Sequence, residues 1–333
     1  MKYKDSRKIF KALKKAKKIL INVHRSPDPD SVGSALAFYE LLVSFKKEVK
    51  VICPNKLTEE NIFLPHSKVV EKVDFSKFDF SKWNIFLVLD SANWDMVTGF
   101  DQIKKPNIKT ILIDHHITSK QFGDINLIDD KVSSTAELVY LLFKDWKIKF
   151  TNTISENLLA GIIGDTGIFE YPNVTSQTME VARELMEKGA DKDNIILHIY
   201  RNYSFNKLKF WEEIIKRMEF DEKNRFVYSA VPFNVFKDYQ KPVSSKEIAA
   251  SMFCPVIKGA DFGFVMIEEE ENILKISFRS KKDFDVSKVA EGLGGGGHKS
   301  AAGATIRNKD FDEAVKRVLQ VVEKYAQKDN KVF

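Results

Sequence analysis

Residues 111–116 read Ile111-Leu112-Ile113-Asp114-His115-His116, an apolar β-like run that ends directly in three side chains able to bind a metal ion. In open α/β sheets, ligands bind in the crevice outside the carboxyl ends of the strands. The stretch therefore predicts a strand that carries functional groups at its tip. A polar loop that merely caps a strand would have the same sequence pattern. The other segments of the chain are needed to distinguish the two interpretations.

A second apolar run, residues 19–23, leads into His24 and then into Asp28 and Asp30. Two prolines in this segment fix φ, so we expect an extended loop rather than a helix. Alternate side chains of an extended loop share one side. The imidazole and the two carboxylates can therefore converge on one point.

Two more segments repeat the design. Asp90 ends the apolar run 85–89, and Asp165 lies in Gly164-Asp165-Thr166-Gly167, where glycine lets the backbone approach a ligand closely. A single aspartate after a strand is most often the N-cap of the next helix. Four such segments, interpreted as strand-tip loops of one domain, are hard to explain by capping alone. His66 and His198 have no motif around them and are interpreted as ordinary polar residues.

Composition is that of a globular chain of 333 residues, with 44% hydrophobic and 30% charged residues and a net charge of +6. This length predicts two domains, and the charge is permissive for an anionic substrate. The two cysteines, Cys53 and Cys254, lie in different predicted domains, so we expect free thiols in a reducing, cytoplasmic compartment. Residues 1–18 are typical of an amphipathic helix rather than a signal peptide, and no apolar run approaches a membrane span.

Secondary structure alternates through the first part of the chain. Strand-like runs at 19–23, 49–53, 85–89 and 110–113 are separated by helix-like segments such as Ser34–Lys46 and Ser134–Trp146. This pattern predicts an α/β domain with a parallel sheet and crossover helices, which we assign to residues 1–189, with further helices at Ser155–Ile163 and Ser176–Gly189. Residues 190–222 have helical periodicity and are interpreted as a connector. Residues 223–333 are expected to form a smaller α/β domain with strands at 226–231, 261–267 and 273–279 and helices at Ser244–Phe253 and Asp312–Ala326.

Taken together, the motifs resemble those of the DHH phosphoesterase family, with its DHH-associated C-terminal domain, over nearly the whole chain. The matching segments are His24-x-x-Pro27-Asp28-x-Asp30-x-x-Gly33-Ser34, Asp90-Ser91, Asp114-His115-His116, Gly164-Asp165-Thr166-Gly167 and Gly294-Gly295-Gly296-Gly297-His298-Lys299-Ser300-Ala301-Ala302-Gly303. Ser26 stands where the family commonly has Asn, and Pro29 where it commonly has Gly. Neither position is expected to supply a metal ligand.

The resemblance implies a pair of divalent cations. It assigns His24 and Asp28 to one ion, Asp30, His115 and Asp165 to the other, and Asp90 to a bridge between them. Five clustered aspartates would repel one another without cations, and oxygen and imidazole ligands suit Mn²⁺, with Mg²⁺ or Co²⁺ as alternatives. Such a pair serves hydrolysis of a phosphate ester. His116 is expected to face the substrate and Asp114 to orient a histidine.

The C-terminal domain is expected to grip a phosphate of the substrate. The resemblance assigns this role to Arg279 and Ser280, and the glycine-rich run suits it as a backbone nest for an anion; the residues are Gly295, Gly296, Gly297, His298 and Lys299. A flexible hinge is the alternative interpretation of the glycines. A phosphate grip facing a two-metal site would measure substrate length and favour short nucleotides.

The function that the resemblance implies is hydrolysis of very short RNAs to mononucleotides, together with dephosphorylation of 3′-phosphoadenosine 5′-phosphate (pAp). A cyclic-dinucleotide phosphodiesterase, acting on c-di-AMP or on its linear product pApA, is the rival within the same chemistry. The glycine-rich segment speaks against a pyrophosphatase. A nucleotide sensor with a dead site is the remote alternative, because every matched position carries a usable ligand. Whether the chain forms a homodimer is left open.

Overall fold

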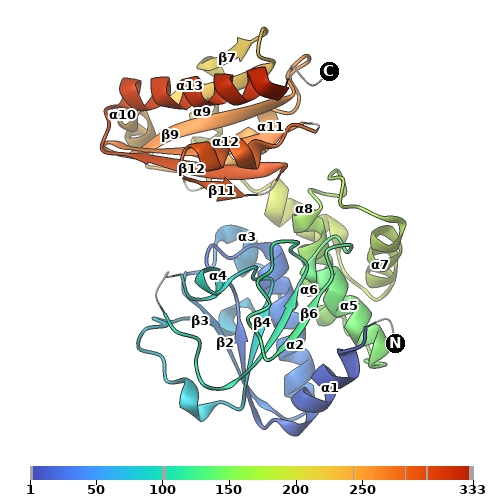
Figure 1. The fold of residues 1–333 in the computed structure, drawn as a ribbon. Helices are drawn as coiled ribbons and strands as arrows, with labels where there is room; N and C mark the ends of the chain where they lie inside the picture. The colour runs from blue at the N-terminus through green and yellow to red at the C-terminus, as the bar shows by residue number, and fades with distance from the viewer. Residues whose placement is uncertain (1–2, 100–102, 243, 282, 298, 330–333) are drawn as a thin grey trace. The chain divides into compact units, whose positions relative to one another are not determined.

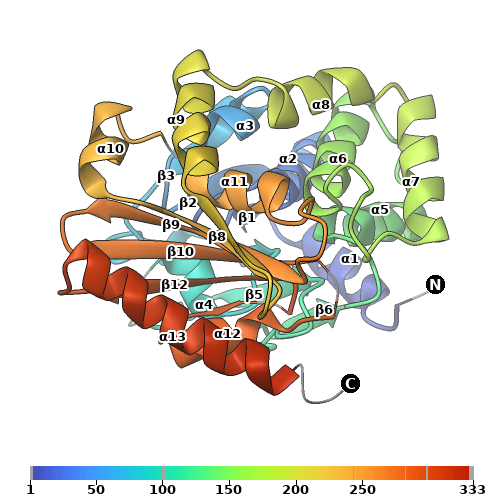
Figure 2. The same ribbon diagram turned by 90° about the horizontal axis from the view of Figure 1, so that it is seen from above.

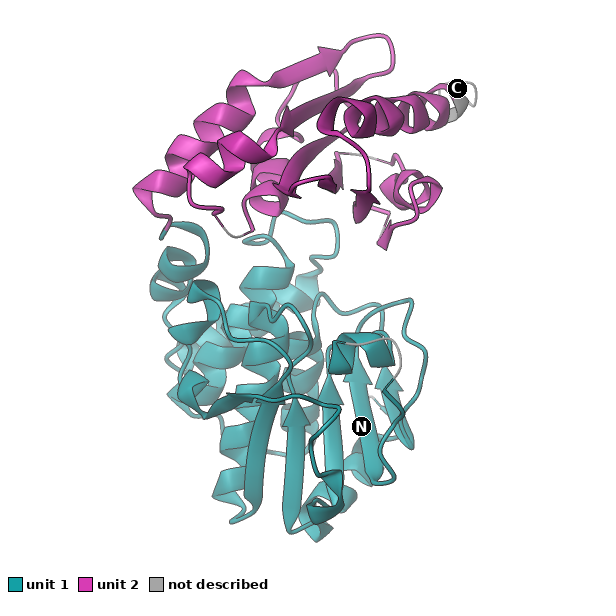
Figure 3. Cartoon of the chain, turned by 90° about the vertical axis from the view of Figure 1, so that its left-hand side faces the viewer, with its two compact units in different colours: residues 1–202 teal, residues 203–333 magenta. Residues whose placement is uncertain are grey.

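The computed structural model describes residues 3–99, 103–242, 244–281, 283–297 and 299–329. The chain forms two compact units, residues 1–202 and residues 203–333 (Figure 3). Each unit has its own sheet and its own hydrophobic core, and each is described here by itself. The division of the chain at residues 189 and 222 stays a prediction.

Unit 1 is built on a six-stranded parallel sheet of order β3-β2-β1-β4-β5-β6 (Figure 1). The strands are β1 (Lys18–Asn22), β2 (Glu48–Cys53), β3 (Val70–Lys72), β4 (Ile85–Leu89), β5 (Lys109–Asp114) and β6 (Ile125–Ile128). The four predicted apolar runs form the four central strands. The edge strands β3 and β6 were not predicted, because they are short and mix polar with apolar residues.

In the part of unit 1 that the structure describes, eight helices and two short 3₁₀ turns accompany these strands (Figures 1 and 2). They are α1 (Ser6–Lys15), α2 (Pro29–Ser44), α3 (Glu59–Ile62), α4 (Trp94–Thr98), α5 (Thr135–Asp145), α6 (Asn152–Asp165), α7 (Ser176–Glu187), α8 (Lys192–Tyr200), η1 (Ser67–Val69) and η2 (Phe80–Lys82). Helices α2, α3 and α4 lie between strands, whereas α5 to α8 follow β6. The core on one sheet face includes residues of α1, α2, α5 and α6, and the core on the other face includes Val97 of α4. Because both faces are buried, the strands read as continuous apolar runs.

Two predictions about the local backbone were wrong. The segment after His24 is not extended throughout, because α2 begins at Pro29. Proline is favoured at the first helical position, where its missing N–H costs nothing, and Asp28 caps the helix by accepting a hydrogen bond of 2.9 Å from the amide of Ser31. Asp165 is the last residue of α6 and does not follow a strand. The acidic residues of the predicted site therefore lie at helix ends as well as at strand ends.

Helices α2 and α6 lie unusually close together. A Cβ atom added to Gly33 of α2 would lie 2.1 Å from the carbonyl oxygen of Asn157 in α6. A Cβ added to Gly161 of α6 would lie 2.8 Å from Oδ1 of Asp30. Glycine at both positions lets the two backbones approach, and this close packing fixes the acidic end of α2 against α6.

Unit 2 is a second six-stranded sheet, of order β11-β12-β10-β9-β8-β7, in which the β8–β9 pair is parallel and the other pairs are antiparallel. Its strands are β7 (Met218–Asp221), β8 (Phe226–Val231), β9 (Phe262–Glu270), β10 (Ile273–Ser280), β11 (Gly296–Gly297) and β12 (Ala301–Arg307). Its helices are α9 (Phe205–Lys216), α10 (Phe233–Asp238), α11 (Ser245–Phe253), α12 (Val286–Gly292) and α13 (Phe311–Asp329).

The predicted α/β fold class is confirmed, with differences of detail in the C-terminal half. The stretch 190–222 was expected to be helical, and it contains α8 and α9 but ends in the strand β7. Cys53 and Cys254 are free and buried, as expected. Over the part of the chain that the structure describes, none of the helices combines the length and the apolar character needed to cross a membrane.

We predict that Gly33→Ala destabilises unit 1 by about 1–3 kcal/mol, because the new methyl group has no room beside the Asn157 carbonyl. Urea unfolding of the purified protein measures the change. Gly296→Ala is the matched control, since a Cβ at Gly296 would meet open space; we expect that variant to stay within about 0.5 kcal/mol of the parent. Equal stability of the Gly33 variant and the parent would show that the two helices can separate without cost.

Candidate metal centre

Three neighbouring strands of unit 1 end in or near predicted site residues. Asp90 follows β4 directly, Asp114 is the last residue of β5, and His24 lies two residues after β1. Because β1, β4 and β5 are adjacent and parallel, their carboxyl ends meet at one edge of the sheet. Asp90 has a φ of 53°, in the left-handed region that non-glycine residues rarely adopt. Backbone strain of this kind is concentrated at functional sites.

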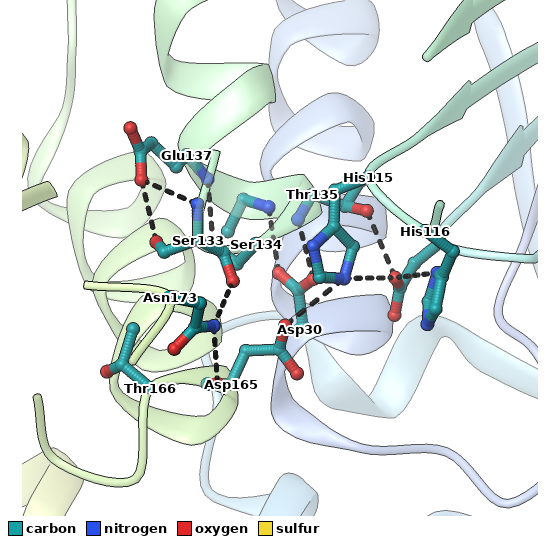
Figure 4. Close-up of polar contacts among 12 residues, drawn as sticks. Asp30, His115, His116, Ser133, Ser134, Thr135, Glu137, Asp165, Thr166 and Asn173 are labelled. Carbon is teal, nitrogen blue, oxygen red and sulfur yellow. Dashed lines mark hydrogen bonds and ion pairs between the residues drawn. The ribbon is translucent and has the colours of Figure 1, made fainter. Parts of the chain in front are cut away.

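Helix ends supply the remaining acidic side chains. Asp28 caps α2, Asp30 lies in the first turn of α2, and Asp165 ends α6. Asp30 and Asp90 are buried, with 1% and 2% of their surface exposed, whereas Asp28 reaches partly into solvent. Figure 4 shows Asp30, Asp165 and His115 pointing toward one another from three different elements.

The potential ligand atoms form three overlapping sets, within each of which all atoms lie no more than 4.8 Å apart. The sets are His24, Asp28 and Asp90; Asp30, His115 and Asp165; and Asp90, His115 and His116. All six predicted metal ligands are thus brought together, although their assignment to ions stays a prediction. The carboxylate of Asp90 belongs to two of the sets.

The two oxygens of Asp90 face different histidines. Its Oδ2 lies 3.3 Å from Nε2 of His24, and its Oδ1 lies 3.6 Å from Nε2 of His115. His24 Nε2 also lies 3.2 Å from Asp28, and His115 Nε2 lies 3.1 Å from Asp165. One carboxylate therefore joins two groups of ligands, which is the arrangement expected of a bridge between two ions.

The contacts of His24 leave its Nε2 free to bind a cation. Its Nδ1 lies 2.7 Å from the carbonyl oxygen of Arg25, so this nitrogen carries the proton that it donates. In the neutral ring, Nε2 then presents a lone pair to Asp28 and Asp90. Acceptors facing acceptors repel unless a proton or a metal ion lies between them. Burial alone would lower the pKa of His24, but the two carboxylates raise it well above its ordinary value.

The carboxylates of the centre lie so close together that they shift one another's pKa values. Burial and the nearby Asp90 and Asp165 raise the pKa of Asp30 well above its ordinary value. Burial and the nearby Asp90 and Asp28 do the same to the pKa of Asp165. The pKa of Asp90 is lowered, because His24 and His116 outweigh the opposing effect of burial. Divalent cations would relieve this repulsion, and nitrogen and carboxylate ligands fit Mn²⁺ or Mg²⁺.

Asp114 and His116 form a second, tighter pair. Asp114 is fully buried, and its Oδ1 lies 2.7 Å from Nδ1 of His116 and accepts the amide of His115 at 2.9 Å. Burial would lower the pKa of His116, but Asp114 and Asp90 raise it to about 10. The ring of His116 is held at Nδ1 by Asp114, while part of the ring remains exposed to solvent.

The sequence predicted the helix at Ser134–Trp146, and α5 begins there, but sequence reasoning missed that its first residues border the centre (Figure 4). Both oxygens of Asp30 accept backbone amides there, from Thr135 at 2.7 Å and from Ala136 at 2.8 Å. A signal was present, because Ser134 followed three residues later by Glu137 resembles a capping box. That pattern identifies a helix start and not its neighbours, so it could not have revealed the contact.

The predicted phosphate-binding residues lie in unit 2. Arg279 and Ser280 end β10, and residues 294–295 lead into β11 (Gly296–Gly297), which pairs with β12 beside β10. The guanidinium of Arg279 donates from Nε to Ser251 Oγ at 2.8 Å and from Nη1 to Ser277 Oγ at 3.0 Å. These bonds fix the orientation of the arginine side chain at the end of the strand.

The glycine-rich loop is partly engaged in capping α12. The amide of Gly294 donates to Glu291, and that of Gly295 donates to Ala290. A nest for an anion would therefore depend on the amides that follow, beginning at the exposed Gly296. Lys299 is exposed and lies 3.5 Å from Asp283, and the predicted residue His298 lies outside the described residues.

Known proteins resemble the chain over both units. Residues 18–162 match the model of the DHH family N-terminal domain, and residues 226–328 match the DHHA1 domain. The bifunctional oligoribonuclease and PAP phosphatase NrnA of Thermus thermophilus is 29% identical over 91% of this chain and 89% of that protein. The protein of the same name from Bacillus subtilis is 27% identical over 89% of this chain and 91% of its own length.

A crystal structure of an exopolyphosphatase-related protein from Bacteroides fragilis superposes with a TM-score of 0.88 at 27% identity, covering 97% of this chain and 96% of the other. RecJ of Thermus thermophilus, bound to Mn²⁺, superposes with a TM-score of 0.52 at 13% identity, covering 98% of this chain and 55% of RecJ, and shares the fold. The first matched domain contains every predicted metal ligand except Asp165, and the second contains the predicted phosphate loop. The chain therefore belongs to the DHH phosphoesterase family and is a metal-dependent hydrolase.

Proposed function

We propose that the chain is a Mn²⁺-dependent oligoribonuclease that hydrolyses very short RNAs to mononucleotides and also converts pAp to AMP. The observation that carries the proposal is the carboxylate of Asp90, which faces one group of ligands with each oxygen. The NrnA relatives, which align with about nine-tenths of the chain, support the choice of substrates. Two free, buried cysteines support a cytoplasmic location.

The proposed ligands divide as the sequence motifs imply. His24, Asp28 and Asp90 would hold one cation, and Asp30, His115 and Asp165 would hold the other, with Asp90 shared. When bound, such a pair supplies an activated water and stabilises the negative charge that develops on the phosphoryl group.

The chain's own contribution to the proton balance comes from His116. Asp114 holds Nδ1 of the ring, and part of the ring is exposed to solvent, so we propose that Nε2 donates a proton to the leaving oxygen. Asp114 acts through this ring as a positioning residue. Its buried carboxylate accepts hydrogen bonds from the histidine side chain and from the backbone of the same loop.

Unit 2 would supply recognition of a second phosphate. Arg279, with Ser280 beside it and Gly296, Gly297 and Lys299 in the neighbouring loop, can form charge-assisted hydrogen bonds to phosphate oxygens. We propose that this phosphate-binding site, rather than the metal ligands, makes the enzyme prefer short substrates. A chain has a terminal phosphate only at its end, so a substrate that must place this phosphate in unit 2 while it is cleaved at the metal ligands has to be short.

Substrate choice is tested by side-by-side turnover of an RNA dinucleotide, pAp, pApA and c-di-AMP. We expect Mn²⁺ to support hydrolysis of the dinucleotide and pAp, chelation to abolish it, and Ca²⁺ to restore little, since its larger and looser coordination fits a compact pair poorly. Full activity in metal-stripped protein would rule out the metal-dependent account. Faster turnover of the cyclic or the linear adenosine dinucleotide would instead assign the enzyme to cyclic-dinucleotide degradation.

Asp90→Asn should lower activity more than Asp114→Asn, because the shared carboxylate serves both ions whereas Asp114 acts through His116. Asparagine keeps the shape of the side chain, so both variants should still fold and melt cooperatively without metal. Rates in Mn²⁺, with melts in chelator as the folding control, measure both effects. Equal losses of activity at the two positions would show that Asp90 is no bridge.

Arg279→Ala should reduce kcat/KM for the dinucleotide and for pAp by roughly ten- to a hundredfold, since a charge-assisted hydrogen bond is worth about 1.5–3 kcal/mol. The small ester bis-p-nitrophenyl phosphate does not need the grip and should be affected little. Lys275→Ala removes a cation of the same strand that pairs with Glu269 and serves as the control. If the small ester loses as much activity as the dinucleotide, unit 2 is not the phosphate clamp.

A further inference from the structure

Thr135, the first residue of α5, contacts two of the proposed ligands at once. It is fully buried, and its Oγ1 lies 3.0 Å from Oδ1 of Asp90. Its backbone amide donates to Oδ2 of Asp30 at 2.7 Å. An ionised carboxylate can only accept, so the threonine hydroxyl is the donor to Asp90. One residue thus links the shared carboxylate of Asp90 to Asp30, a ligand of the second group. Figure 4 shows Thr135 beside Asp30.

The hydroxyl determines how the Asp90 carboxylate is turned. Rotation about the terminal bond of an aspartate side chain has broad, shallow preferences, so the carboxylate needs external partners to hold one orientation. Thr135 engages Oδ1, which keeps that oxygen on the side of His115 at 3.6 Å. Oδ2 is thereby left facing His24 at 3.3 Å. A rotated carboxylate would no longer present one oxygen to each group.

Thr135 is itself held in place by the start of α5. Ser134 caps the helix by accepting the amide of Glu137 at 3.0 Å. The buried carboxylate of Glu137 accepts hydrogen bonds from the Ser133 hydroxyl at 2.6 Å and from Thr178 of α7 at 2.9 Å. This network ties the first turn of α5 to α7, so the hydroxyl of Thr135 is offered from a fixed position.

We propose that Thr135 is a positioning residue that keeps Asp90 in the bridging orientation, so that two cations bind as a coupled pair rather than independently. The inference rests on the proposed two-metal function. A purely structural role, in which Thr135 is an ordinary first residue of a helix, predicts a change in stability but none in the coupling of the ions.

The test uses Thr135→Val, which removes the hydroxyl but keeps the amide and the shape of the side chain, and Thr135→Ser, which keeps the hydroxyl. Mn²⁺ binding without substrate is measured by calorimetry, and the interaction between the two ions by electron paramagnetic resonance. We expect the parent and Thr135→Ser to bind two ions with a spin-coupled spectrum. Thr135→Val should bind the second ion roughly tenfold or more weakly and lose the coupled signal.

Two further variants control for misfolding of Thr135→Val and for a general loss of stability at the start of α5. Thr135→Ala replaces the valine variant if the latter does not fold. Ser134→Ala removes the helix cap without touching Asp90, so it should lower the melting temperature while the coupled signal persists. Retention of the coupled pair in the valine or alanine variant would overturn the inference, as would its equal loss in Ser134→Ala. A parent protein that binds fewer than two Mn²⁺ ions would instead refute the two-metal function, and this inference with it.

Discussion

Repulsion among crowded carboxylates is the constraint on which the rest of unit 1 depends. Asp30, Asp90 and Asp165 converge at one edge of the sheet, and their like charges are costly in a low-dielectric setting. Three kinds of partner offset this repulsion. Histidines face Asp90 and Asp165, backbone amides of α5 face Asp30, and the remaining negative charge is left for divalent cations. The metal requirement of this enzyme is therefore a consequence of its electrostatics as much as of its chemistry.

How much of this could be predicted from sequence depends on the range of the interactions. Strand tips were predictable, because an apolar run followed by Asp90 or by Asp114 and its histidines is a local signal. The start of α2 was misread, since proline both breaks helices and favours their first position. The threonine that contacts Asp90 was missed because the two residues are 45 positions apart. No local pattern reports a contact over such a separation.

In unit 2 as well, elements with a local sequence pattern were predictable and elements that depend on distant contacts were not. Long strands such as β9 and β10 were visible as apolar runs, whereas the two-residue strand β11 and the short helix α12 exist through their pairing and packing. The arginine at the end of β10 was recognised by its motif. Its orientation is set by Ser251 of α11, a residue for which the sequence offers no clue.

The wide spacing of the ligands along the chain has a consequence for biosynthesis. The proposed set begins at His24 and ends at Asp165, and the amide that binds Asp30 comes from a residue 105 positions further on. No fragment that has left the ribosome before α6 is complete can assemble the centre. Metal binding then adds its free energy to the finished unit as a whole. A chain that stops before Asp165 lacks a ligand of the second group, so the complete pair of ions can stabilise only the finished unit 1.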